Sequence, residues 1–214
     1  MHGAVMRPAG PFVTLQLAVK RLVDIVGATM GLAVCSPLLM AAAVAIKLSS
    51  PGPILYRWRI AGQHGRPIQS LKFRTMVPDA DARKAALAPH NQMRGPVFKL
   101  ERDPRVTRIG RLLRRTSIDE LPQLWSVLMG DLSLVGPRPP LQSEYARFTP
   151  YQRQKLLVKP GVTCTWQARG RSTIADFDDW LAMDLEYIRT WSLRKDFEIL
   201  LATVPAVLKG TGAH

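Results

Sequence analysis

Two adjacent carboxylates, Asp119 and Glu120, follow an arginine pair that begins at Arg114. Ser117 and Glu120 have the spacing of a capping box, and Pro122 is tolerated within a first helical turn. A helix N-terminus also favours negative charge and phosphate, so a carboxylate placed there stays ionised at neutral pH and can act as a nucleophile. The stretch therefore predicts a helix start that is either purely structural or also catalytic.

Cations and glycines follow in short, stiff segments. In Gly136-Pro137-Arg138-Pro139 the prolines fix a rigid extended turn and hold Arg138 out from it. Lys159-Pro160-Gly161 and the run 166–172, which includes Arg171, add residues suited to approaching a phosphate closely. Each segment alone is more typical of a solvated loop, so only their combination favours a phosphate site.

An uncharged apolar segment at residues 25–46 is long enough to reach across a hydrocarbon core of about 30 Å. Ser36 and Pro37 interrupt it, and the proline predicts a kink. Lys20 and Arg21 precede the segment and Lys47 follows it, so the rule that cationic flanks stay cytoplasmic applies to both ends. These features favour a re-entrant helix-break-helix, in which Ser36 satisfies a carbonyl that the proline frees. A straight span and a buried helix of a soluble protein are the alternatives.

The composition restricts the partners without choosing one. The chain has 214 residues and a net charge of +14, which favours anionic lipid, nucleotides or nucleic acid. Nucleic-acid binding lacks a recognisable reading motif and would leave the apolar segment unexplained. Cys35 and Cys164 fit no metal-ligand spacing, and we interpret both as unpaired thiols.

The remaining elements predict a mixed α/β fold with a small sheet. Residues 54–76 favour two short strands joined by a loop, and residues 78–89 favour a short exposed helix. Residues 105–115 place apolar residues at helical spacing among arginines, as in an amphipathic helix that lies on anionic lipid or simply faces solvent. Residues 176–191 and 196–208 each predict a helix packed on one core.

Taken together and in this order, the segments resemble the bacterial sugar transferase family, the monotopic phosphoglycosyl transferases. The resemblance runs from Lys20 to the C-terminus. It rests on Lys20-Arg21-Leu22-Val23-Asp24, the Ser36-Pro37 break, Ser50-Pro51-Gly52-Pro53, Lys72-Phe73-Arg74-Thr75-Met76, Thr116-Ser117-Ile118-Asp119-Glu120-Leu121-Pro122-Gln123, Gly136-Pro137-Arg138-Pro139 and Lys159-Pro160-Gly161.

The resemblance implies transfer of a sugar 1-phosphate from a UDP-sugar to undecaprenyl phosphate, with release of UMP. Asp119 would be the nucleophile that forms an aspartyl-phosphosugar, and Glu120 a metal ligand or a base. Both carboxylates would lie at the expected metal, Mg2+. By the same resemblance Lys72, Arg114 and Arg171 would clamp phosphates, and Pro137, Arg138 and Pro139 would hold the nucleotide.

The resemblance also implies an organisation and a location. Residues 1–19 would be an N-terminal tail, residues 20–48 a re-entrant membrane helical hairpin, and residues 49–214 a cytoplasmic catalytic domain with interfacial amphipathic helices. The location would be the cytoplasmic face of the bacterial inner membrane, and the product would initiate exopolysaccharide, O-antigen or glycoconjugate assembly. The residues do not determine the oligomeric state, so a homodimer stays open.

Two departures from the family pattern qualify this expectation. The family usually has glycine where Cys164 stands and an apolar residue where Thr165 stands, which predicts a different substrate fit near Arg171. Only nineteen residues precede Lys20, as expected for a stand-alone catalytic unit, and the C-terminal part favours glucose or galactose. A basic membrane-surface protein, with Asp119 and Glu120 only capping a helix, is the non-catalytic alternative.

Overall fold

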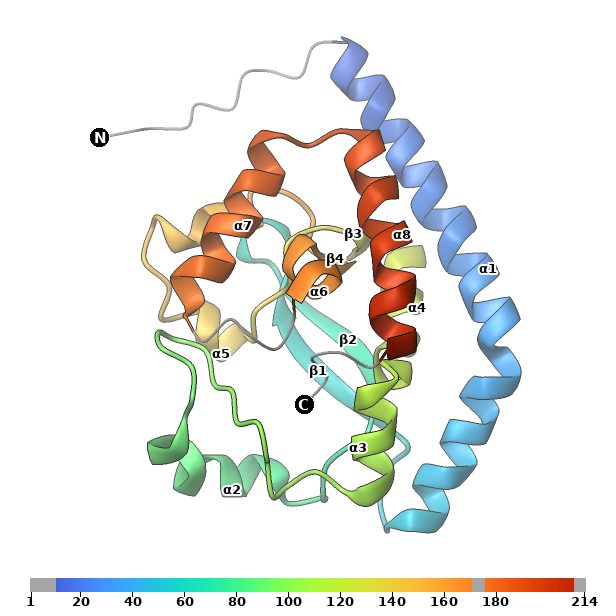
Figure 1. Ribbon diagram of the computed structural model, residues 1–214, viewed down its shortest axis with the longest axis vertical. Helices are drawn as coiled ribbons and strands as arrows, with labels where there is room; N and C mark the ends of the chain where they lie inside the picture. Colours follow the sequence, from blue (N-terminus) through green and yellow to red (C-terminus); the bar gives the residue numbers. More distant parts are fainter. Residues whose placement is uncertain (1–10, 171–175, 210–214) are drawn as a thin grey trace.

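The computed structural model describes residues 11–170 and 176–209, and it shows the mixed α/β fold that the sequence predicts. A long helix runs along one side of the chain, an antiparallel hairpin lies at the centre, and shorter helices surround the hairpin (Figure 1). The helices are α1 (Pro11–Ser49), α2 (Ala80–Leu87), α3 (Arg108–Arg115), α4 (Leu124–Leu128), α5 (Gln142–Tyr145), α6 (Thr165–Gly170), α7 (Phe177–Arg189) and α8 (Leu193–Lys209), with 3-10 turns η1 (Gln63–Gly65), η2 (Ala88–His90), η3 (Ile118–Gln123) and η4 (Gln152–Leu156). The strands are β1 (Leu55–Ala61), β2 (Pro67–Phe73), β3 (Ser133–Val135) and β4 (Gly161–Thr163).

Helix α1 is continuous over 39 residues, although Pro37 lies inside it. Figure 1 shows that the helix changes direction near its middle. The Ser36 hydroxyl donates to the carbonyl of Ala33 at 2.8 Å, which is the carbonyl that Pro37 leaves without a donor. The predicted kink and its side-chain compensation are therefore present, but they bend one helix and do not divide it in two. The helix begins at Pro11, so it includes residues 11–19, which the sequence analysis assigned to the N-terminal tail.

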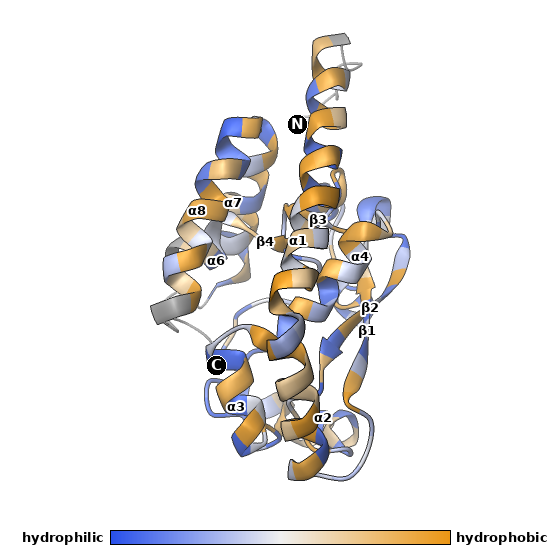
Figure 2. Ribbon diagram, turned by 90° about the vertical axis from the view of Figure 1, so that its right-hand side faces the viewer, coloured by the Kyte–Doolittle hydropathy of each residue, from blue (hydrophilic) through white to orange (hydrophobic). Residues whose placement is uncertain are grey.

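One face of α1 packs on the rest of the chain in its middle and toward its C-terminal end. Ala28 is buried in a core with Leu124 and Val127 of α4, while Ala42 and Ile46 pack against Phe73 and Leu113. The exposed face is strongly apolar, as Figure 2 shows along most of the helix. Only 11% of its most apolar stretch is buried, and by length and composition it could cross a membrane. A core helix of a soluble protein would be mostly buried, so that alternative does not fit.

The small sheets are two separate pairs of strands. Strands β1 and β2 pair antiparallel with Trp58 opposite Ser70, which confirms the predicted hairpin. Strands β3 and β4 pair in parallel, with Ser133 opposite Gly161 and Val135 opposite Thr163. This second pair brings the segments 136–139 and 159–161 side by side.

The predicted helices at residues 78–89, 105–115, 176–191 and 196–208 correspond to α2, α3, α7 and α8. Helix α3 begins at the Thr107 cap, whose hydroxyl accepts from the Gly110 amide at 2.9 Å. Leu113 is buried, whereas Leu112 and the arginines at 108, 111 and 115 are exposed. The helix is therefore amphipathic, with most of its positive charge on the outer side.

Candidate active site

The adjacent carboxylates lie in the 3-10 turn η3, which follows α3 directly. Ser117 before this turn has a left-handed backbone (φ 56°, ψ 16°) and makes no side-chain capping hydrogen bond. The predicted capping box is therefore wrong, because the Glu120 side chain pairs with two cations instead of turning back to the chain. A non-glycine residue with positive φ costs free energy and is common beside functional groups. Here it sets the entry into the turn that carries Asp119.

Glu120 is held by cations from two other elements. Lys72 of β2 donates to its Oε1 at 2.8 Å, and Arg138 donates to the same oxygen at 3.0 Å. Burial alone raises the pKa of Glu120, but Arg138 and Lys72 outweigh it and hold the pKa well below its usual range. Glu120 is therefore ionised, and its Oε1 holds the side chains of Lys72 and Arg138 close together.

Lys72 also lies over the ring of Trp58, with its Nζ 3.6 Å from the ring centroid. Trp58 faces Ser70 in the hairpin, so it is a diagonal neighbour of Lys72 on the same face of the sheet. Burial lowers the pKa of Lys72, and Glu120 partly offsets this. Trp58 was not among the site residues predicted from the sequence, although strand alternation and a defined hairpin register would have placed it beside Lys72.

Asp119 differs from its neighbour Glu120, because none of the described residues pairs with it. It is 8% exposed and lines a cavity whose wall also includes Lys72, Arg114 and Arg138, and its carboxylate makes no hydrogen bond or ion pair with the described residues. Burial and the charge of Glu120 raise its pKa from 3.8 to about 6, although Lys72, Arg114 and Arg138 act in the opposite direction. The carboxylate is still mainly ionised at neutral pH. An ionised, unpaired carboxylate surrounded by cations is a competent nucleophile toward phosphorus.

Arg114 is positioned by the segment that follows β2. Its Nε donates to Thr75 Oγ1 at 2.9 Å, and both residues line the cavity. In the same segment Arg74 donates to the carbonyls of Ser50 and Pro51 at 2.9 and 2.5 Å. The turn that ends α1 is thereby tied to the strand that carries Lys72.

Arg138 reaches the site because two backbones cross very closely. A Cβ on Gly161 would lie 2.1 Å from the amide nitrogen of Gly136, so only glycine fits there. The Gly161 amide donates to the carbonyl of Pro137 at 3.0 Å, and Pro137 and Pro139 are both buried. The predicted stiff turn that presents Arg138 is therefore observed.

The segment Lys159-Pro160-Gly161 has a structural role that the sequence did not indicate. Gly161 is needed because its backbone passes so close to that of Gly136 that no side chain fits between them. Lys159 is not among the described residues that line the cavity. Burial and the nearby Arg21 lower the pKa of Lys159, which places it toward α1. Phosphate binding by this segment stays a prediction, and the described residues place Lys159 outside the cavity that holds the two carboxylates. Arg171, the third predicted phosphate clamp, lies outside the described residues.

The cavity has a volume of about 500 Å³ and combines cationic and aromatic walls. Trp166 and Trp180 stack with their ring centroids 4.3 Å apart and an interplanar angle of 3°. Arg138 lies 5.9 Å from the Trp166 ring centroid, which joins the aromatic wall to the carboxylates. The sequence did not indicate Trp180 as a cavity residue, because nothing in helix α7 shows that it stacks on α6.

The carboxylates of Asp119 and Glu120 could hold Mg2+ only if phosphate oxygens of the substrate supply further ligands. The described residues contain no group of three or more His, Cys, Asp or Glu side chains that could hold a metal. Mg2+ is usually held by one or two carboxylates together with substrate phosphates and water. Asp119 and one oxygen of Glu120 provide that minimum, so the residues fit a metal shared with a diphosphate.

Comparison with known proteins agrees with the geometry. The family model described as "Bacterial sugar transferase" matches residues 15–210. The chain belongs to the bacterial sugar transferase family. The match includes the bent helix, the hairpin and the carboxylate turn, so it covers every element that forms the cavity.

Several curated members of the family are similar to the chain. It is 46% identical over 197 residues to "Galactosyl transferase CpsE" of Streptococcus agalactiae, which covers 92% of this chain and 44% of that protein. It is 42% identical over 217 residues to "UDP-glucose:undecaprenyl-phosphate glucose-1-phosphate transferase" of Caulobacter vibrioides, covering 98% and 77%. It is 40% identical over 199 residues to "Undecaprenyl-phosphate galactose phosphotransferase" of Salmonella typhimurium, covering 91% and 41%. The chain thus spans less than half the length of two of these relatives.

Proposed function

We propose that this chain transfers a hexose 1-phosphate from a UDP-sugar to undecaprenyl phosphate, through a covalent intermediate on Asp119. The observation that carries the proposal is the contrast between the two carboxylates. Glu120 is neutralised by two cations, whereas Asp119 is buried at the cavity wall without a described partner. The names of the relatives support both substrates, and they include both glucose and galactose transferases.

The reaction would have two displacement steps at one phosphorus. A carboxylate oxygen of Asp119 attacks the sugar-bearing phosphorus, the bond to the bridging oxygen breaks, and UMP leaves with that oxygen. A phosphate oxygen of undecaprenyl phosphate then attacks the same phosphorus, and the Asp119 carboxylate leaves unchanged. The charges balance without a net proton transfer, so the site needs cations more than a general acid.

The described residues supply these cations. Lys72 and Arg138 each use only part of their hydrogen-bonding capacity on Glu120, so they keep donors for phosphate oxygens. Arg114 adds a third cation at the cavity wall. Mg2+ bound at Asp119 and Glu120 would offset the negative charge of the diphosphate. The aromatic wall would exclude water from an intermediate that water can hydrolyse.

The exposed apolar faces support attachment to one leaflet. Both ends of the apolar part of α1 pack on the same domain, through Ala28 near one end and Ile46 near the other. A helix that crossed the bilayer would have to separate these ends. We therefore propose that α1 enters and leaves the cytoplasmic leaflet of the inner membrane. Beside it, exposed side chains such as Trp125 of α4 and Leu201 of α8 would lie at the interface.

The chemistry is tested by incubating purified full-length protein with UDP-glucose, UDP-galactose and other UDP-sugars, with and without undecaprenyl phosphate. With a UDP-sugar alone, we expect one UMP per active site and a hexose-phosphate adduct on the peptide that contains Asp119. Asp119→Asn should abolish both, while Asp131→Asn, which changes a carboxylate outside the cavity wall, should not. Turnover without any adduct on Asp119 would refute the nucleophile. Lipid binding without UMP release would favour the non-catalytic surface protein.

The topology is tested by single cysteines at positions 10 and 55 in intact spheroplasts, in a background without Cys35 and Cys164. Both positions should be protected from an impermeant thiol reagent and become labelled only after lysis. Labelling of either one from outside would show that α1 spans the membrane.

A further inference from the structure

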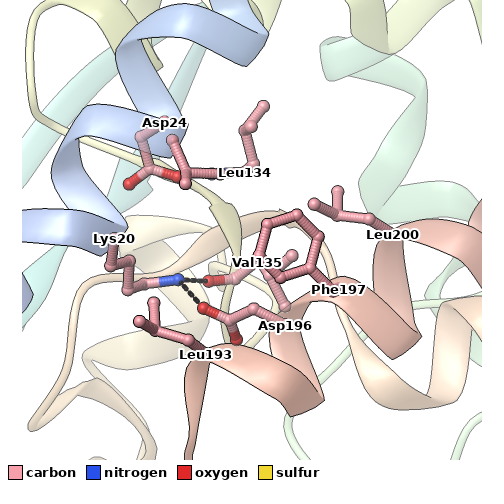
Figure 3. A pocket seen from close by; sticks show the side chains of 9 residues that line it. Lys20, Asp24, Leu134, Val135, Leu193, Asp196, Phe197 and Leu200 are labelled. Carbon is pink, nitrogen blue, oxygen red and sulfur yellow. Dashed lines mark hydrogen bonds and ion pairs between the residues drawn. The ribbon is translucent and has the colours of Figure 1, made fainter. Parts of the chain in front are cut away.

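The N-terminal part of α1 is fastened to strand β3 by two charged side chains that the proposed chemistry does not use. Lys20 Nζ donates to the carbonyl of Val135 at 2.9 Å. Asp24 accepts from the Leu134 amide at 2.9 Å and from the Ser133 hydroxyl at 3.0 Å. Figure 3 shows Lys20 reaching from α1 to Val135, with Asp24 one turn further along the helix. Each of the three residues of β3 is therefore hydrogen-bonded to a side chain of α1.

A buried acid from α8 completes this attachment. Asp196 accepts from Lys20 at 2.5 Å, from the Tyr187 hydroxyl at 2.6 Å and from Trp191 Nε1 at 3.2 Å. The Tyr187 hydroxyl also lies 3.3 Å from the Val135 carbonyl. Asp24 and Asp196 are only 3% and 5% exposed, so these acidic side chains are buried away from solvent. The sequence predicted Lys20 only as a cationic flank that stays cytoplasmic, and did not indicate these contacts.

Strand β3 leads directly into the segment that presents Arg138. Gly136 follows Val135, its amide donates to Thr163 at 3.0 Å, and a side chain there would strike the backbone of Lys159. Pro137 and Pro139 then fix the backbone on either side of Arg138. The stretch from Val135 to Arg138 therefore has little freedom to absorb a displacement of β3. A shift of the Val135 carbonyl would move the guanidinium that contacts Glu120 at 3.0 Å.

We propose that Lys20 and Asp24 are positioning residues, which place Arg138 against Glu120 by seating α1 on β3. Helix α1 is then part of the active site's support and not only an attachment to lipid. The effect on catalysis rests on the proposed function, whereas the effect on the backbone from 133 to 139 does not. The two are separable by experiment.

Arg21 is a matched control in the same helical turn. It donates to the carbonyls of Val127 and Leu128 at 2.6 and 2.7 Å, so it fastens α1 to the end of α4 instead of β3. Arg21→Met and Lys20→Met each remove one long cation that binds backbone carbonyls. If the only role of these residues is to hold α1, the two substitutions should have similar consequences.

Hydrogen exchange on the full chain in lipid nanodiscs tests the structural half. Lys20→Met should raise the exchange rate of the Leu134 and Gly136 amides by about tenfold, while Arg21→Met should change them less than about twofold. Equal effects of both substitutions, or no effect of Lys20→Met, would overturn the proposal. If Lys20→Met does not fold because Asp196 is left unpaired, the combination Lys20→Met with Asp196→Asn removes both charges and is measured instead.

A double-mutant cycle with Arg138→Met tests the catalytic half by UMP release. Lys20→Met should lower kcat/KM by about tenfold in the otherwise unchanged protein but by less than about twofold in the Arg138→Met background. Arg21→Met should have the same effect in both backgrounds. Multiplicative effects of Lys20→Met and Arg138→Met would overturn positioning through Arg138. If the unchanged protein releases no UMP from any UDP-sugar, the proposed function fails, and hydrogen exchange alone decides whether Lys20 positions β3.

Discussion

Asp119→Asn should make the protein more stable at neutral pH while it removes activity. The pKa of Asp119 is raised from 3.8 to about 6, because burial and the charge of Glu120 disfavour its ionised form. The folded state therefore prefers the protonated acid. Below pH 4 the acid is protonated in both states, and this preference makes no difference relative to a neutral amide. Between pH 4 and about 6 the unfolded state ionises while the folded state keeps its proton, so the wild type loses stability relative to the variant as pH rises, and the loss is complete above about pH 6.

The magnitude follows from the size of the pKa change. At about 1.36 kcal/mol per pKa unit, the rise from 3.8 to about 6 corresponds to about 3 kcal/mol above pH 7. Asp119 is only 8% exposed, so solvent screening reduces this value little. For a chain of this length, about 3 kcal/mol corresponds to a rise in Tm of roughly 6–12 °C.

The assay is thermal unfolding in detergent with EDTA, so that no divalent cation stabilises either protein. Wild type and Asp119→Asn are compared at pH 4.5, 6 and 7.5, and the difference in Tm should grow across this range. Asp103→Asn is a control of opposite sign. Burial acts to raise the pKa of Asp103, but hydrogen bonds from Arg105 outweigh it and lower the pKa. Its amide variant should therefore be less stable than wild type at pH 7.5.

Two results would refute this reasoning about Asp119. The first is a variant that is no more stable than wild type at pH 7.5. The second is a stabilisation of equal size at pH 4.5 and 7.5, because an effect of packing alone would not depend on the protonation of Asp119.

Three further substitutions test other parts of the structure. Gly161→Ala should destabilise the protein by about 3 kcal/mol or more in thermal unfolding, because its Cβ would lie 2.1 Å from the Gly136 nitrogen; unchanged stability would contradict the crossing. Lys72→Met removes a cation proposed to bind the diphosphate, and a charge-assisted hydrogen bond of this kind is worth about 1.5–3 kcal/mol, so kcat/KM for UMP release should fall by about 10- to 100-fold. A fall of less than about threefold would exclude that role. Pro37→Leu should straighten α1 and expose a cysteine at position 10 to reagent from outside while the basic domain after α1 stays inside, and continued protection would show that the proline does not set the topology.

Local patterns predicted the elements of this fold well. Alternation and turn residues were sufficient for the β1–β2 hairpin, and helical spacing was sufficient for α3, α7 and α8. Pro37 predicted the bend in α1 because its missing donor acts on the nearest carbonyl, a strictly local effect. In each of these cases the physical cause lies within a few residues of its consequence.

The arrangement of the site was less accessible, because it depends on pairs that are distant in sequence. Ser117 and Glu120 have capping spacing, yet Glu120 pairs with Lys72 and Arg138, which no local rule can indicate. Lys20 has the sequence context of a membrane flank, yet its charge is used on Asp196, 176 positions away. Charged residues show in the sequence that they need partners, but the fold decides which partners they obtain.

The apolar part of α1 packs on the domain both near Ala28 and near Ile46, and this affects the kinds of bilayer that the protein can occupy. A transmembrane segment must match the thickness of the hydrocarbon layer, and a mismatch is relieved by tilting or by deforming the lipid. If α1 enters and leaves one leaflet, as we propose, it has no such length to match, because its apolar part rests on one domain near Ala28 and near Ile46 and would displace lipid from a single monolayer. The height of the carboxylates above the headgroups is then set by protein packing alone, and the carrier's phosphate must rise to meet them.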